Sequence, residues 1–229
     1  SHGIAITGSG IVCRIGIDCA SVLDALKNKT SGIEQPKYVQ TVHRELPVGE
    51  VKLSNDEMKA ALGLDTELEF SRTALIGAIA LRQSLTDARL SSEAVAGRKT
   101  VFVSGTTVGG MDLTERHYES MRRDEQDASC LAHHDCGSNT RDIAAICGLE
   151  CEMTTVSTAC SSALNAIILG ARMLLSGEAD VVIAGGAEAL SRFHLNGFNS
   201  LLILDNERCR PFDANRQGLP LGEGAAYVV

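Results

Sequence analysis

The chain has 229 residues, of which 44% are hydrophobic and 22% are charged, and this composition is typical of a globular domain with a substantial core. Aromatic residues make up only 3% and tryptophan is absent, so aliphatic side chains must fill the core, as they do in α/β folds with parallel strands. The net charge of −8 argues against a nucleic-acid partner, and no apolar run approaches the length of a membrane span.

The eight cysteines are spread along the chain without the spacing of a secreted disulfide scaffold. Several of them fall inside expected helices or strands. We therefore expect reduced thiols and a cytoplasmic location. Ser1 and His2 resemble a remnant of an expression tag and are left out of the fold prediction.

Residues 3–10 predict a first buried strand that runs into a glycine turn. A dinucleotide-binding loop would need a third glycine, but Cys13 stands at that position. We therefore expect no nucleotide in this loop, and the sequence indicates no other cofactor.

Apolar residues spaced three and four apart predict several helices in the first half of the chain. Asp18 is placed to cap the first of them, and Ser54 or Asn55 the second. Between these two helices, residues 35–53 contain two prolines and little periodicity, which predicts a loop with at most a short edge strand. The expected helices are 18–28, 54–62, 67–90 and 111–123, with a strand at 99–104 before the last of these.

Cysteine and histidine cluster in residues 130–136, and these residue types can bind zinc. Their compact spacing is not that of a recognised zinc finger or ribbon, and adjacent histidines point different ways in any regular element. We expect no metal here, but a loop that leads into a helix at 140–147. Ser138 or Asn139 would cap that helix and Gly148 would end it.

The functional prediction depends on residues 153–186. A short strand ends in small residues before Cys160, a helix follows at 161–175, and after Gly177 another buried strand is expected at 180–184. Apolar residues lie on nearly every side of this helix, which predicts that it is buried all round.

Cys160 therefore lies where a strand leads into a helix N-terminus. Unpaired amide groups and the helix dipole at such a position stabilise a thiolate and a developing oxyanion. A small buried core cysteine is the alternative that placement alone leaves open. After this region, residues 191–205 have a mixed pattern, and we expect a polar loop at 205–222 and the start of a strand at 225–229.

Three motifs, in order, carry a resemblance to a known family. The sequence TACSS at 158–162 resembles the nucleophile motif of the β-ketoacyl-acyl-carrier-protein synthases, the condensing enzymes of the thiolase superfamily. GEADVVIAGGAE at 177–188 is similar to the strand and turn that follow the nucleophile helix in that family. The third motif, which the family has ahead of its chain midpoint, comprises RPFD at 210–213, Arg216, Gly218 and GEGA at 222–225.

The resemblance implies one half of a thiolase-like α/β fold, with a mixed, mostly parallel sheet covered by helices and a buried nucleophile helix. Residues 1–229 would be the N-terminal domain. The family's second half brings a lysine and two histidines, one of them in a His-Gly-Thr-Gly motif that this sequence lacks. We therefore expect that the histidine-bearing half is missing from this chain and that the chain alone is inactive in condensation.

The implied activity is acyl transfer from a carrier thioester, followed by decarboxylative condensation with malonyl-carrier protein in fatty acid or polyketide synthesis. Cys160 would be the nucleophile and would supply one oxyanion donor through its own N–H. Phe198, Leu201 and Leu202 resemble the segment that flanks the family's acyl pocket, although a packed helix explains them equally well.

The implied partner is an acyl carrier protein. Arg116, Arg122 and Arg123 would give such an acidic partner a local basic patch, against the alternative of a solvated helix face. Family members are homodimers, so we expect a homodimer or a partner chain that supplies the second half. Two alternatives stay open: a non-catalytic ketosynthase-like scaffold, although such partners have lost the cysteine, and a coenzyme A enzyme of the same superfamily.

Overall fold

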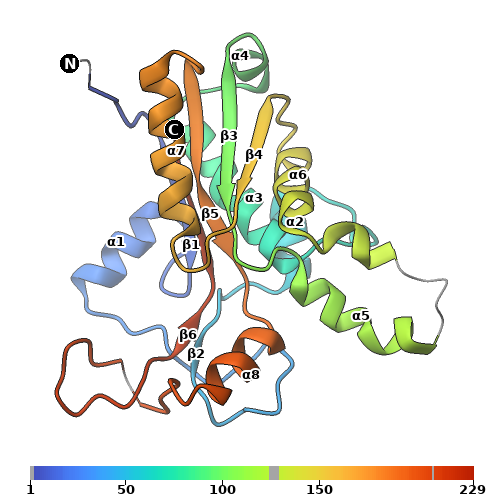
Figure 1. Ribbon diagram of the computed structural model, residues 1–229, viewed down its shortest axis with the longest axis vertical. Coiled ribbons are helices and arrows are strands. Elements are labelled where there is room, and N and C mark those ends of the chain that lie inside the picture. The colour runs from blue at the N-terminus through green and yellow to red at the C-terminus, as the bar shows by residue number, and fades with distance from the viewer. Residues whose placement is uncertain (1–2, 124–128, 208) are drawn as a thin grey trace.

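The computed structural model describes residues 3–123, 129–207 and 209–229, so Ser1 and His2 lie outside the described residues. In the described part of the chain, five strands form one mixed sheet in the order β1-β7-β5-β3-β4 (Figure 1). Strand β3 pairs in parallel with β4 and β5, whereas β7 pairs antiparallel with β5 and β1. The strands are β1 (Ser9–Cys13), β3 (Thr100–Gly105), β4 (Glu152–Val156), β5 (Val181–Glu188) and β7 (Gly224–Val228), and a separate parallel pair joins β2 (Val48–Gly49) to β6 (Leu221–Gly222).

Helices cover both faces of this sheet (Figure 1). Helix α3 (Arg72–Asp87) packs on one face together with α2 (Asn55–Leu62) and α6 (Cys136–Ile146), and α7 (Ser162–Ser176) packs on the other. The α3 side holds the larger apolar core, with Phe102, Ile183 and Tyr227 fully buried. The remaining helices are α1 (Cys19–Lys27), α4 (Ser92–Ala96), α5 (Met111–Arg123), the 3-10 turn η1 (Ser129–His133) and α8 (Arg192–Ser200). The predicted α/β class is therefore confirmed.

Capping residues decide where the helices begin. Asp18 and Ser54 cap α1 and α2 as predicted, each with a reciprocal capping box. Helix α3 begins five residues later than the predicted residue 67, because Ser71 is its N-cap. The prediction for α6 is wrong at its start: Asp135 is the N-cap and accepts a hydrogen bond from the Ser138 amide, so the helix begins four residues before residue 140.

The first strand also lies later than predicted. Residues 3–7 have no regular structure, and β1 begins at Ser9, which pairs with Val228 of β7. Gly8, just before this strand, and Gly10, its second residue, do not form the predicted glycine turn. A Cβ atom on Gly10 would come within 2.0 Å of the Ala80 carbonyl oxygen, so the glycine permits close packing of β1 on α3.

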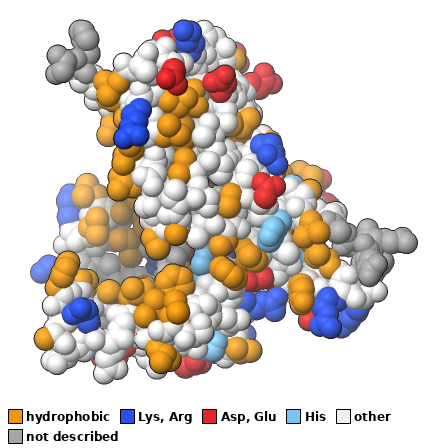
Figure 2. Space-filling view, in the orientation of Figure 1, with side chains coloured by type: hydrophobic (Ala, Val, Ile, Leu, Met, Phe, Trp, Pro, Cys, Tyr) orange, Lys and Arg blue, Asp and Glu red, His pale blue; other side chains and the backbone are white. Residues whose placement is uncertain are grey.

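The prediction that the central helix is buried all round is wrong. In α7 only Ser162, Ala166 and Gly170 are buried, on the side that faces β3 and β5. Its outer side carries an apolar strip, which Figure 2 shows over this helix. The strip consists of Leu164, Ile167, Ile168 and Leu175, with exposed fractions from 40% for Ile168 to 67% for Leu175.

By length and hydropathy alone, residues Ala159–Ser176 could cross a membrane, which the sequence analysis did not anticipate. One such helix is weak evidence for a span. Its small buried residues pack directly on the sheet, an arrangement expected of a helix inside a folded domain.

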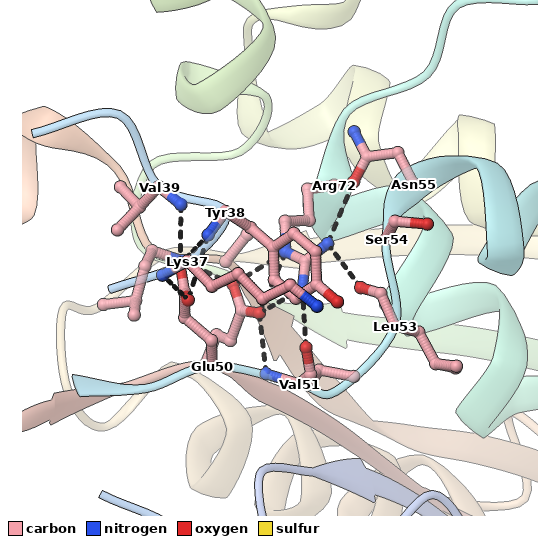
Figure 3. A network of polar contacts seen from close by, with 12 residues as sticks. Lys37, Tyr38, Val39, Glu50, Val51, Leu53, Ser54, Asn55 and Arg72 are labelled. Carbon is pink, nitrogen blue, oxygen red and sulfur yellow. Dashed lines mark hydrogen bonds and ion pairs between the residues drawn. The ribbon is translucent and has the colours of Figure 1, made fainter. Parts of the chain in front are cut away.

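A buried ion pair joins Arg72, the first residue of α3, to Glu223 between β6 and β7, and Figure 3 shows Arg72 beside the loop before α2. The Arg72 guanidinium contacts the Glu223 carboxylate with an Nη2–Oε1 distance of 2.6 Å, and the two side chains are 7% and 0% exposed. Arg72 also donates to the carbonyls of Val51 and Leu53, and Glu223 accepts from the amides of Val51 and Leu190. Both buried charges therefore have several hydrogen-bond partners, which a buried ion pair requires.

Glu50 organises the rest of this loop (Figure 3). Its buried carboxylate accepts hydrogen bonds from the amides of Lys37, Tyr38 and Val39 at 2.6–3.1 Å. The ring of Tyr38 in turn lies 4.9 Å from the Arg72 guanidinium carbon, a cation–π contact. The loop before α2, which has little regular structure, is thus held by the Glu50 carboxylate and the Arg72 guanidinium.

Two carboxylates of α5 hold the beginnings of two other helices. Asp112 Oδ2 accepts from the Arg72 amide of α3 at 2.8 Å, and Glu115 accepts from the amides of Arg192 and Phe193 of α8, both at 2.7 Å. Burial raises the pKa of Asp112, whose Oδ1 has no hydrogen-bond partner among the described residues. Helix α5 therefore fixes α3 and α8 relative to each other.

Replacement of Glu223 by alanine should lower the free energy of unfolding by about 3–5 kcal/mol, because it leaves the Arg72 charge buried without its partner. Urea denaturation of the variant measures this loss. The double variant Arg72→Met/Glu223→Leu removes both charges and should cost less than Glu223→Ala alone. An equal or larger loss in the double variant would contradict this account of the pair.

Candidate active site at Cys160

Cys160 lies in the turn that joins β4 to α7, at the carboxyl edge of the parallel strands β3, β4 and β5. Ligand sites of α/β sheets form at this edge. The residue is exposed and lines a hollow of about 450 Å³. Ala159, just before it, has a φ of 53°, a left-handed conformation that is uncommon for any residue but glycine. The predicted strand-to-helix position is confirmed, and the alternative of a buried core cysteine is wrong.

The first turn of α7 approaches the end of β3 closely. A Cβ atom on Gly105 would lie 2.5 Å from the carbonyl carbon of Ser162, so a larger residue would push the helix away. This contact sets how near the turn of Cys160 can sit to the sheet.

Side chains from α7 brace the turn that carries Cys160. Ser162 Oγ accepts from the Thr158 amide at 2.9 Å and donates to the Ala159 carbonyl at 2.7 Å. Asn165 Nδ2 donates to Thr158 Oγ1 at 2.8 Å and to Ser161 Oγ at 3.2 Å. The roles of Ser162 and Asn165 could not be predicted from the sequence, because contacts across a turn with a left-handed residue have no periodic signal.

Glu188 and Thr107 also line the hollow. A Glu188 carboxylate oxygen accepts from the Thr107 amide at 2.5 Å, and Thr107 Oγ1 donates to the Ala159 carbonyl at 3.5 Å. Glu188 thus holds the turn after β3 against the turn of Cys160. The signal that could have identified it is its position at the end of β5, at the same sheet edge as Cys160.

All eight cysteines lie in the described part of the chain and all are free thiols. Burial raises the pKa of Cys147 to about 11 and also raises that of Cys151, so both stay protonated at neutral pH. Cys13 lines the same hollow as Cys160 but is only half-exposed.

The residues predicted to flank an acyl pocket lie in and after α8. Phe198 is half-buried, whereas Leu201 and Leu202 are 67% and 85% exposed. None of the three is among the described residues that line the hollow of Cys160. A packed helix therefore accounts for Phe198, which lies in α8, but not for Leu201 and Leu202, which follow the end of α8 at Ser200. The acyl-pocket role stays a prediction.

The three predicted docking arginines all lie exposed on α5, and their docking role stays a prediction. Arg116 turns back toward α3, where its Nη2 lies 3.3 Å from the Phe70 carbonyl oxygen and 3.4 Å from Asp112 Oδ2. Arg122 and Arg123 are exposed in the last turn of α5, where Figure 2 shows a group of basic side chains.

The cluster of cysteine and histidine forms the turn η1 and the start of α6. His133 Nδ1 lies 2.7 Å from Asp142 Oδ2, and His134 Nδ1 lies 2.8 Å from Thr114 Oγ1. Among the described residues no group of three or more potential ligands could hold a metal ion. His117 and His194 also have local partners, Glu69 and Ser191, and neither lines the hollow.

Comparison with known sequences identifies the family of this chain. The sequence profile described as "Beta-ketoacyl synthase, N-terminal domain" matches residues 1–229. The chain belongs to the β-ketoacyl synthase family. Nodulation protein E of Rhizobium meliloti is 29% identical over 99% of this chain and 57% of its own length. The ketoacyl synthase alpha subunit of the tetracenomycin polyketide synthase of Streptomyces glaucescens is 27% identical over the same shares of the two chains.

Solved structures of ketosynthases share the fold. The ishigamide ketosynthase/chain length factor superposes with a TM-score of 0.88 at 27% identity, over 97% of this chain and 56% of the other. A ketosynthase from Xenorhabdus doucetiae, in complex with its chain length factor, gives 0.79 at 28% identity over 100% and 58%. The chain therefore has the thiolase-like ketosynthase fold, and it spans just over half the length of the relatives it matches.

Cys160 should react with iodoacetamide faster than the other seven thiols in the folded protein, because it is exposed at a helix N-terminus. Cys147 should be the slowest of those whose pKa is raised by burial. Limited alkylation followed by peptide mapping measures the order. If Cys13 or Cys209 is labelled first by a wide margin, the assignment of Cys160 as nucleophile is wrong.

Proposed function

We propose that this chain is the N-terminal half of a β-ketoacyl synthase, in which Cys160 accepts an acyl group from a carrier-protein thioester. One observation carries the proposal: in a chain of this family, the exposed Cys160 lies in a hollow at the N-terminus of α7. The names of the relatives support a pathway of fatty acid or polyketide synthesis.

The first stage needs a thiolate and an oxyanion hole. The Cys160 sulfur attacks the thioester carbonyl, an S–C bond forms, and the carrier thiol leaves after the tetrahedral intermediate collapses. The Cys160 amide would be one donor to the oxyanion. In the family's second stage, malonyl-carrier loses carbon dioxide and the resulting enolate attacks the acyl carbon, which releases the cysteine sulfur.

The second stage needs histidines that this chain does not bring to the hollow. A second unit would supply them by covering the open surface beside α7. Ile11 of β1 and Ala226 of β7 line the same hollow as Cys160, and the apolar strip of α7 lies exposed next to it. A unit packed over these residues would place its own side chains beside the sulfur. A homodimer or a partner chain is the assembly that the proposal implies.

The free thiols are consistent with a reducing compartment, and we propose a cytoplasmic location. A non-catalytic partner subunit is the alternative function. It would not need a cysteine exposed at this turn.

The chain alone should acquire an acyl group on Cys160 slowly and should make no detectable β-ketoacyl product. A missing acid–base group costs a factor of about 10²–10⁴ in rate, and a missing oxyanion donor about 10²–10³. These factors do not simply multiply, but either one makes turnover hard to detect. The assay supplies acyl-carrier and malonyl-carrier, and follows both carbon dioxide release and the mass of the protein.

The matched control for this assay is Cys160→Ala, which should show no added acyl mass. Addition of a separate polypeptide that carries the His-Gly-Thr-Gly half should restore condensation. Absence of acylation on Cys160 in that reconstituted pair would favour the non-catalytic alternative. Rapid condensation by the chain alone would show that its own histidines do the work assigned here to a second unit.

For the carrier protein we propose a docking site at the end of α5. Reversal of charge in Arg122→Glu/Arg123→Glu should weaken carrier binding several-fold at low salt and less at high salt, because surface charges steer an acidic partner. Arg98→Glu/Lys99→Glu is the matched control, since these two exposed basic residues precede β3, at the end of that strand away from α5. Calorimetry or surface plasmon resonance measures the affinity. Equal weakening by both pairs would remove the docking proposal.

A further inference from the structure

The hollow of Cys160 contains one carboxylate. Among the described residues that line it, only Glu188, at the end of β5, has an acidic side chain, and none is a lysine, arginine or histidine. The other lining residues are glycines, small or aliphatic residues, hydroxyl residues and the two cysteines Cys13 and Cys160. Within the described part of the chain, a negative charge therefore stands in a mostly apolar site that no basic residue lines.

Neutral groups fix the Glu188 carboxylate in place. Its Oε2 accepts from the Thr107 amide at 2.5 Å, and its two oxygens lie 3.4 and 3.5 Å from the Thr106 hydroxyl. Thr106 Oγ1 accepts from the Gly109 amide at 3.3 Å, so its own hydrogen is free to point at the carboxylate. These partners orient the carboxylate but carry no full charge that would cancel it.

Two hydrogen bonds connect this carboxylate to the turn of Cys160. Thr107 donates its amide to Glu188, and its Oγ1 donates to the Ala159 carbonyl at 3.5 Å. Ala159 directly precedes Cys160, and both line the hollow together with Glu188. A group that enters the hollow to reach the sulfur therefore comes close to the carboxylate.

We propose that Glu188 selects the acyl groups that Cys160 accepts, because its charge disfavours an acyl group that ends in a carboxylate. Like charges repel more strongly where little water lies between them. A neutral acyl chain meets no such repulsion and can bury apolar surface against the aliphatic lining. The inference rests on the proposed role of Cys160 as nucleophile, and it assigns neutral acyl thioesters as the substrate class of the first stage.

The same charge separates the two stages of the reaction. In the first stage an S–C bond forms on Cys160, the C–S bond of the thioester breaks, and the carrier sulfur takes up a proton. A malonyl group carries a carboxylate, so Glu188 disfavours its transfer to the free sulfur. Once a neutral acyl chain is attached, it fills part of the hollow and shields a later malonyl group from Glu188.

The first test compares two alkylating reagents that differ in charge. Iodoacetate is anionic and iodoacetamide is neutral, and both lose iodide as the sulfur–carbon bond forms. Peptide mapping measures both rates at Cys160 in the whole assembled protein, with any unit that covers α7 in place. Glu188→Gln should raise the ratio of the iodoacetate rate to the iodoacetamide rate about three- to tenfold at low salt.

Matched controls separate the charge from its surroundings. Glu178→Gln removes the same charge beyond the end of α7 away from Cys160, and it should leave the ratio at Cys160 unchanged. Cys19 is exposed at the start of α1 and does not line the hollow, so its ratio should be the same in every variant. Glu188→Asp keeps the charge and should keep the ratio at Cys160 low. If Glu188→Gln folds poorly, Glu188→Met removes the charge at similar size and should raise the ratio as well.

The second test uses thioesters of N-acetylcysteamine as acyl donors. Butyryl and succinyl groups have the same chain length, but only succinyl ends in a carboxylate. Mass spectrometry of the unchanged protein should show Cys160 acylated by butyryl in preference to succinyl. Glu188→Gln should reduce that preference about three- to tenfold, because the repulsion is gone.

Each result has a distinct meaning. If neither thioester acylates Cys160 in the unchanged protein, the proposed function itself is wrong. If butyryl is transferred but Glu188→Gln changes neither ratio, the selective role of Glu188 is wrong and the proposed function stands. If Glu188→Asp raises the iodoacetate ratio as much as Glu188→Gln does, Glu188 acts through its hydrogen bond to Thr107, and selection by charge is overturned.

Discussion

The candidate site depends on one contact between two segments of the backbone, where the first turn of α7 meets the end of β3. Gly105 allows it, since a Cβ atom there would lie 2.5 Å from the Ser162 carbonyl carbon. Because of this approach, the N-terminus of the helix, the ends of the parallel strands and the left-handed Ala159 meet around the turn that carries Cys160. A sheet edge alone would offer only carbonyls and side chains at this place, whereas the helix adds amide donors.

Polar side chains then fix the surroundings of this contact. Glu188 holds the turn after β3, and Ser162 holds the turn before α7. The Arg72–Glu223 pair does similar work for a loop that has almost no regular structure. In each case a side chain satisfies backbone amides that no strand or helix could satisfy, which is the general requirement for irregular segments in a folded core.

Most of the helices and strands, and the position of Cys160, could be predicted from the sequence. Cys160 was placed correctly because a short β-forming run, small residues and a long apolar stretch are local signals. The burial of α7 was predicted wrongly, because apolar composition does not say which neighbour covers a surface, and Leu164 and Leu175 are 61% and 67% exposed among the described residues. The start of β1 depends on its register with β7, more than two hundred residues away, which no local pattern contains. Asp135 was missed as a cap because Ser138 and Asn139 are equally good capping residues by type.

The two carboxylates of α5 have a mechanical consequence. Phe198 stands on a helix whose first amides bind Glu115, and the same α5 follows directly after the turn that lines the hollow of Cys160. Helix α8 cannot slide without either breaking those hydrogen bonds or moving α5 with it. A bulky group that displaced α8 would therefore also displace α5. Because α5 follows the turn after β3, the residues of that turn that line the hollow of Cys160 would move with it.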